Sequence, residues 1–241
     1  MIVQACLNGA RPSDFHPRLP LTSRAMADDA VLCVAAGAAE LHLHPPSAPG
    51  TESLAAVDAT IPAIRRACPG TFVGVSTGAW IEADEAATRA AIEGWTHLPD
   101  YASVNLSEPD APAVMDMLRR RGVGIEAGLA TIADAERFLK LPGHEKVLRV
   151  LIEIGEQDLD GARQMADGIA ALLERAELGR PILLHGFDET VWRFVELAHQ
   201  RRWSTRIGLE DGKHLHGGTV AADNAALVAG AVEIYRGTPA D

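Results

Sequence analysis

AAGAAELHLHPP, Ala35 to Pro46, joins the end of a predicted helix to a short predicted strand that carries two histidines. Gly37 can end the helix, because glycine adopts the left-handed conformation without a steric penalty. Side chains alternate between the two faces of a strand, so His42 and His44 project to one face and the leucines beside them to the other. This stretch therefore predicts a helix-to-strand unit with paired imidazoles at the strand end.

The same alternation of short apolar runs and longer helical patterns continues along the chain. The predicted strands are Ile2–Leu7, Glu40–His44, Thr71–Ser76, Tyr101–Leu106, Gly124–Ala127, Val147–Ile152, Pro181–His185 and Thr205–Leu209. The predicted helices are Ser23–Ala36, Leu54–Cys68, Glu82–Gly94, Ala111–Arg121, Thr131–Leu139, Asp160–Glu174, Glu189–Arg201 and Val220–Tyr235.

Eight strand–helix units in 241 residues are typical of an α/β fold of the (β/α)8 TIM-barrel type, which takes roughly 250 residues. An open doubly wound sheet is the alternative, but no GxGxxG follows the first predicted strand. No linker or low-complexity segment interrupts residues 1–241, so we expect a single domain with its active site at the C-terminal ends of the strands.

Composition excludes several classes of partner. The net charge of −11 is unfavourable for binding nucleic acid or an anionic membrane surface. The three cysteines are far apart in the sequence, which predicts neither a disulfide framework nor a cysteine zinc site. No signal peptide or long apolar span is apparent, so we expect a cytoplasmic protein that acts on a small molecule.

Polar residues recur where the predicted strands end. In chain order they are Asn8, His42 with His44, Ser76 with Thr77, Ser103 with Asn105, Glu126, Glu153, His185, and Glu210 with Asp211. Buried polar groups destabilise a fold unless they have partners, so a purely structural barrel would not favour this distribution. It indicates an active site at one rim.

The two histidines at the second strand end are half of a metal site. Taken alone, they are explained equally well as hydrogen-bonded histidines near the rim. RIGLEDG, Arg206 to Gly212, adds two acids after the eighth strand, and alternation gives Glu210 and Asp211 different roles. An ion pair with Arg206 is the structural alternative. Two imidazoles and one carboxylate suit zinc, and ferrous iron in other settings, and leave coordination positions open for a substrate oxygen.

The other polar residues at the strand ends have both structural and functional interpretations. Ser76, Thr77 and Gly78 either hold a carboxylate or form a turn and helix cap. Glu126 is either an acid–base group or half of a structural ion pair, and His185 is most simply a hydrogen-bonded core histidine.

KHLHGG, Lys213 to Gly218, contains a second histidine pair after the eighth strand. Because His214 and His216 lie in a predicted loop, alternation does not place them on one face. The glycines and Thr219 are expected to open the last helix, where free amides would bind an anion or serve only as a turn and cap.

Seven motifs, taken together and in order, resemble the β-keto acid cleavage enzyme family, which includes the 3-keto-5-aminohexanoate cleavage enzyme. They are NGA, LPLT, AGAAELHLH, VSTG, ASVN, RIGLEDG and NAALV, and the resemblance runs from Ile2 to about Ile234. It implies a TIM barrel with Zn²⁺ held by His42, His44 and Glu210. It also implies that a β-keto acid condenses with acetyl-CoA and is cleaved to acetoacetate and a new acyl-CoA, in a homo-oligomeric enzyme.

The resemblance also implies roles for residues around the metal. Asp211 would remove the proton between the ketone and the carboxylate, and Arg206 would orient Asp211. Ser76 would help to hold the substrate carboxylate. The remaining pocket residues it implies are Ser103, Asn105 and Glu126.

Three departures from the family pattern concern the substrate. Arg11 stands where the aminohexanoate enzyme has an acid, which favours a substrate with an anionic tail. Pro45 and Pro46 replace the region of a family arginine, and no glycine-rich run follows the sixth or seventh strand, where relatives admit CoA. A CoA-independent metal-dependent lyase or aldolase, or a metal-retaining barrel that only binds a ligand, are therefore the alternatives.

Overall fold

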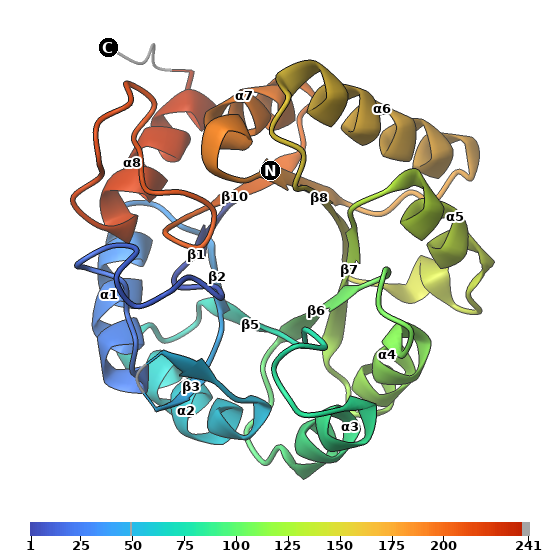
Figure 1. Cartoon of the computed structure of the whole chain (residues 1–241), viewed down its shortest axis with the longest axis horizontal. Coiled ribbons are helices and arrows are strands. Elements are labelled where there is room, and N and C mark those ends of the chain that lie inside the picture. Colours follow the sequence, from blue (N-terminus) through green and yellow to red (C-terminus); the bar gives the residue numbers. More distant parts are fainter. Residues whose placement is uncertain (49, 238–241) are drawn as a thin grey trace.

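The computed structural model describes residues 1–48 and 50–237, and its centre is a closed barrel of parallel strands (Figure 1). The order around the barrel is β1-β10-β9-β8-β7-β6-β5-β2. The strands are β1 (Val3–Cys6), β2 (Glu40–Leu43), β5 (Phe72–Ser76), β6 (Tyr101–Asn105), β7 (Gly124–Leu129), β8 (Arg149–Ile154), β9 (Ile182–Gly186) and β10 (Ser204–Ile207).

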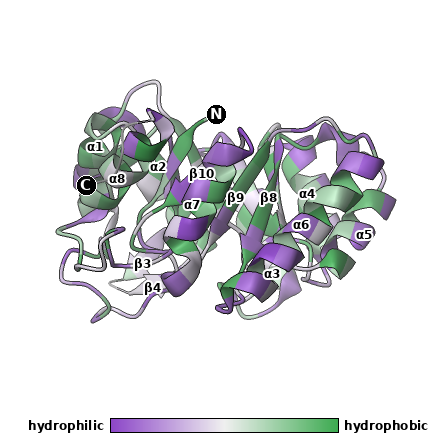
Figure 2. Cartoon of the chain, turned by 90° about the horizontal axis from the view of Figure 1, so that it is seen from above, coloured by the Kyte–Doolittle hydropathy of each residue, from purple (hydrophilic) through white to green (hydrophobic). Residues whose placement is uncertain are grey.

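α-Helices form a ring around these strands (Figure 1). They are α1 (Ser23–Ala35), α2 (Val57–Ala67), α3 (Glu85–Gly94), α4 (Ala111–Arg120), α5 (Ile132–Lys140), α6 (Leu159–Arg175), α7 (Val191–Gln200) and α8 (Asn224–Tyr235). Hydrophobic residues predominate along β8 and β9, whereas the surrounding helices alternate between hydrophobic and hydrophilic residues (Figure 2). Strands covered by helices on one side and by the barrel interior on the other are expected to be apolar throughout.

The predicted (β/α)8 TIM barrel is confirmed, and each predicted strand coincides with an observed one to within about two residues at either end. The alternation of predicted strands and helices identified the fold because each unit buries one apolar strand under one amphipathic helix. Gly37 ends α1 with a φ of 111°. The single-domain boundary, the homo-oligomeric state and the cytoplasmic location stay predictions. In the part of the chain that is described, no helix has the length and apolar character needed to cross a membrane.

The loop after β10 differs from the prediction. The last helix begins at Asn224 rather than Val220, because the Asp223 carboxylate accepts a hydrogen bond from Ala226 N and caps it there. The two glycines of KHLHGG belong instead to a turn in which Leu215 N donates to Thr219 O at 2.8 Å. The expectation that they open a helix and offer its amides to an anion is therefore wrong.

A small hairpin was not predicted. It pairs β3 (Pro46–Ala48) with β4 (Thr51–Glu52) in antiparallel fashion directly after the histidine strand. Two prolines and a short span conceal any period-two pattern, so the sequence reads as a loop. Three 3₁₀ turns complete the described elements: η1 (Leu54–Ala56), η2 (His144–Lys146) and η3 (Asp188–Thr190).

Asn224 connects α8, α1 and the rim of the barrel. Its amide donates to Leu7 O at 2.8 Å and to the Asp29 carboxylate at 2.7 Å, and its carbonyl accepts from Leu209 N at 2.6 Å. Burial raises the pKa of Asp29 to about 6, although the hydrogen bond from Asn224 opposes this rise. The rim next to Glu210 is thus anchored through a buried carboxyl group.

Asp29→Asn is expected to change how stability depends on pH. Because the folded-state pKa of Asp29 lies above its unfolded value, the wild-type protein loses stability as pH rises through about 6. The variant lacks this titration. The difference in free energy of unfolding, variant minus wild type, should therefore increase by about 1–2 kcal/mol from pH 5 to pH 8. Urea unfolding of both proteins at the two pH values measures the gain, and a constant difference between them would contradict the prediction.

Candidate metal and active site

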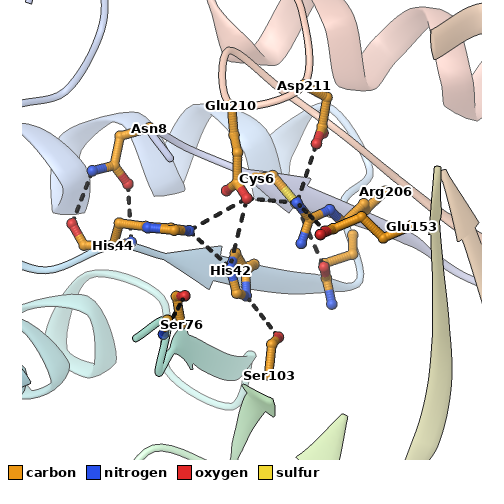
Figure 3. Close-up of polar contacts among 12 residues, drawn as sticks. Cys6, Asn8, His42, His44, Ser76, Ser103, Glu153, Arg206, Glu210 and Asp211 are labelled. Atoms are coloured by element: carbon orange, nitrogen blue, oxygen red, sulfur yellow. Dashed lines mark hydrogen bonds and ion pairs between the residues drawn. The ribbon is translucent and has the colours of Figure 1, made fainter. Parts of the chain in front are cut away.

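Three donor side chains from distant parts of the sequence converge at the C-terminal rim of the barrel (Figure 3). His42 lies in β2, His44 follows that strand directly, and Glu210 follows β10. β1 lies between β2 and β10 and pairs with each of them, which brings their ends together although 168 residues separate His42 from Glu210. The barrel therefore brings together the ligands that the sequence predicted.

The distances between the donor atoms suit a metal ion. His42 Nε2 and His44 Nε2 lie 3.3 Å apart, and Glu210 Oε1 lies 3.3 Å from His44 Nε2 and 3.8 Å from His42 Nε2. Ligands about 2.0–2.1 Å from a tetrahedral zinc ion lie about 3.3–3.4 Å from one another. Among the described residues, the buried Glu210 Oε2 has no hydrogen-bond partner. The donor set therefore fits a divalent metal.

Hydrogen bonds on the far side of each imidazole orient it. His44 Nδ1 lies 2.8 Å from Glu52 Oε2, and His42 Nδ1 lies 3.5 Å from Ser103 Oγ. Ser103 Oγ in turn donates to Glu126 Oε1 at 2.6 Å. Partners of this kind fix the tautomer that presents Nε2 to a metal.

Burial and neighbouring charges set different protonation states for the two histidines. Burial lowers the pKa of His42 to about 3, so its ring is neutral at pH 7. Burial also opposes charge on His44, but the carboxylates of Glu210 and Glu52 raise the pKa of His44 to about 10. Arg206 and the histidines hold the pKa of Glu210 well below its usual range despite its burial. A metal ion that binds here must therefore displace a proton from His44.

A second charged group adjoins the metal ligands (Figure 3). Arg206 Nη2 lies 2.5 Å from Glu210 Oε1, 3.2 Å from Asp211 Oδ1 and 3.6 Å from Glu153 Oε2. His185 lies between the last two carboxylates, 3.0 Å from Glu153 and 3.3 Å from Asp211. One buried guanidinium thus forms ion pairs with three carboxylates at the rim.

A cavity of about 550 Å³ opens above these groups. Among the predicted site residues, it is lined by Arg11, His42, His44, Ser76, Ser103, Asn105, Arg206 and Glu210. The chain that the structure describes therefore presents the metal ligands to a space of substrate size.

The comparisons with known proteins decide the family. The model of the β-keto acid cleavage enzyme family matches residues 1–240. This chain belongs to the β-keto acid cleavage enzyme family. A search of curated proteins found no significant match.

Solved structures share the fold of this β-keto acid cleavage family member. A ternary complex of ObcA with a C4-CoA adduct and oxalate is 18% identical with a TM-score of 0.70, covering 92% of this chain and 64% of that one. The apo structure of ObcA is 18% identical with a TM-score of 0.69, covering 92% and 62%. The 3-dehydroquinate dehydratase of Geobacillus kaustophilus HTA426 is 12% identical with a TM-score of 0.63, covering 98% and 90%. The chain thus spans less than two thirds of the length of the ObcA chains.

Four predicted site residues of this family member lie outside the described cavity lining. They are Thr77, Gly78, Glu126 and Asp211. Asp211 is fully buried and reaches the rim through Arg206 and His185. Glu126 is also fully buried and pairs with Arg149 at 2.5 Å, which agrees with the ion-pair interpretation of this residue. The Thr77 hydroxyl donates to Ser103 O at 2.8 Å, so it supports the neighbouring strand.

Arg11 lines the cavity but has partners within the chain. It forms an ion pair with Asp188 at 2.9 Å and donates to the carbonyls of Glu210 and Asp211 at 2.9 and 3.0 Å. These bonds leave little of its donor capacity for a substrate carboxylate. The anionic substrate tail inferred from Arg11 stays a prediction, with less support from this geometry.

The second histidine pair does not join the metal ligands. His216 lies 2.8 Å from Glu196 and forms a T-shaped ring pair with Trp192, while His214 O accepts from Trp192 Nε1. His185 is buried and forms a hydrogen bond with Glu153 at 3.0 Å, which agrees with its interpretation as a hydrogen-bonded core histidine, and it also lies 3.3 Å from Asp211.

Two residues that contact predicted site residues, Glu52 beside His44 and Arg149 beside Glu126, escaped the sequence analysis. Glu52 has no strand or motif around it that marks it, and Arg149 was hidden in an apolar run. Glu153 was noted as a strand-end acid without a role, and it lines the cavity. A charged residue inside a predicted barrel strand is the one signal that would have drawn attention to Arg149.

Proposed function

We propose that the chain is a zinc-dependent β-keto acid cleavage enzyme that uses acetyl-CoA and forms acetoacetate and an acyl-CoA. The observation that carries this proposal is the convergence of His42, His44 and Glu210, at near-tetrahedral spacing, on a cavity of about 550 Å³. Zn²⁺ bound there would polarise the ketone of the substrate and stabilise the enolate.

The chain's own residues would supply the remaining chemistry. Asp211 would accept the proton between the ketone and the carboxylate, and Arg206 would hold Asp211 and balance its charge. Because Asp211 is fully buried, we expect substrate to approach it through a small movement of the rim. Ser76 Oγ, which lines the cavity beside the ligands, would donate to the substrate carboxylate.

A CoA-independent lyase or aldolase is the second candidate, and the charges of the cavity favour it. Both guanidinium groups in the described lining, Arg11 and Arg206, are already paired with carboxylates. Glu153 and Asp188 add negative charge to the same wall. CoA carries several phosphate charges, which such a wall does not attract.

The proposed reaction is tested with purified protein whose metal content is measured. A panel of β-keto acids is supplied with and without acetyl-CoA, and acetoacetate and acyl-CoA are quantified. Stoichiometric zinc with acetyl-CoA-dependent acetoacetate is the expected result. Turnover without acetyl-CoA would favour the lyase or aldolase, and bound metal without any turnover would favour the metal-retaining barrel that only binds a ligand. Absence of bound metal would overturn the metal site itself.

A further inference from the structure

Glu52 lies eight residues beyond His44, and the hairpin folds it back onto that ring. Pro46 pairs with Glu52 across β3 and β4, and Ser53 N donates to Pro45 O at 2.9 Å. Asn8 holds the other side, because it bonds both His44 N and His44 O. The backbone around both residues is thus fixed.

The two side chains are close and shielded from water. Glu52 Oε2 lies 2.8 Å from His44 Nδ1, and the side chains are 15% and 5% exposed. The indole of Trp80 stacks beside His44 with 6.4 Å between ring centroids, and Trp80 Nε1 donates to Glu52 Oε1 at 3.4 Å. Both oxygens of the carboxylate are therefore engaged, one by His44 Nδ1 and the other by Trp80 Nε1.

In the described part of the chain, His42 Nδ1 has a hydroxyl rather than a carboxylate as its partner. His42 Nδ1 is 3.5 Å from a hydroxyl, and the nearest carboxylate in that direction, Glu126, lies beyond it. A hydrogen bond to an ionised group is about twice as strong as a neutral one. His44 is therefore held more firmly than His42.

We propose that Glu52 is a positioning residue of the metal site, which accepts the Nδ1–H of His44 and directs Nε2 toward Glu210. This inference rests on the proposed zinc site. It adds a residue from the hairpin to a site otherwise built at the ends of barrel strands. Removing such a carboxylate partner typically weakens metal affinity about 10- to 100-fold.

Zinc binding to wild type, Glu52→Gln, Glu52→Asp and Glu82→Gln tests the proposal, by competition with a chromophoric chelator. Glu82→Gln is the matched control. Glu82 accepts a hydrogen bond at 2.8 Å from the backbone N of Leu54, two residues beyond Glu52, but it is not a partner of His44. We expect Glu52→Gln to raise the zinc Kd about 10- to 100-fold, with Glu52→Asp intermediate, and Glu82→Gln to stay within about threefold of wild type.

The cobalt(II) absorption spectrum separates positioning from direct ligation. At saturating cobalt, Glu52→Gln should keep the wild-type spectrum, because the three ligands are unchanged. A spectrum with one oxygen ligand fewer, or equal Kd values for Glu52→Gln and Glu82→Gln, would overturn the inference while leaving the proposed function intact. Wild-type protein that binds no zinc would overturn both.

Discussion

His42→Ala is expected to lower kcat/KM for β-keto acid cleavage by at least about 1,000-fold, equivalent to about 4 kcal/mol of transition-state stabilisation. The side chain is 1% exposed, and its Nε2 lies 3.3 Å from that of His44 and 3.8 Å from Glu210 Oε1. Without it, two protein donors remain, and the variant should be purified with little bound zinc. Metal analysis and acetoacetate formation measure the two effects separately.

His216→Ala is the matched control for this variant. Its imidazole bonds Glu196 and lies apart from the three ligands, so activity and zinc content should stay within about twofold of wild type. Retention of both zinc and activity in His42→Ala would refute the proposed metal site. Chelator-treated wild type should lose activity and regain it when zinc is added.

Arg149→Met is expected to lower the free energy of unfolding by about 3–5 kcal/mol, because it leaves a buried carboxylate without its partner. Arg149 lies 2.5 Å from both Glu126 and Glu40, and Glu126 is fully buried. Burial opposes the ionisation of Glu126, but Arg149 lowers its pKa to about 2. Once Arg149 is removed, Glu126 must take up a proton or remain as an unpaired buried charge.

Chemical denaturation at pH 5 and pH 8 measures this loss. The deficit should be smaller at pH 5, since a Glu126 carboxyl with a raised pKa regains stability when it is protonated. Glu126→Gln in the Arg149→Met background should recover part of the loss at pH 8. Arg163→Met, which removes an exposed ion pair with Asp167, should cost no more than about 1 kcal/mol. Equal deficits in the two arginine variants would contradict the assignment.

Local patterns account for what could be predicted of the fold. Each unit needs an apolar strand and a helix with one apolar face, and both periods are visible within about 15 residues. The pattern failed where side-chain bonds set the boundary, as at Asp223, which starts α8 four residues after the predicted position. It also failed for the hairpin, whose strands are too short to show a period.

The sequence by itself determined the barrel and the meeting of His42 and His44 with the acids of RIGLEDG, because strand ends of a parallel barrel meet at one rim wherever they lie in the chain. The resemblance to the family then singled out Glu210 rather than Asp211 as the third ligand. Only the tertiary structure decided which polar residues pair. It paired Glu52 with His44 and Arg149 with Glu126, and it buried Asp211 against Arg206 and His185. Periodicity records which face a side chain occupies, whereas a hydrogen bond depends on distances of about 3 Å between residues far apart in the sequence.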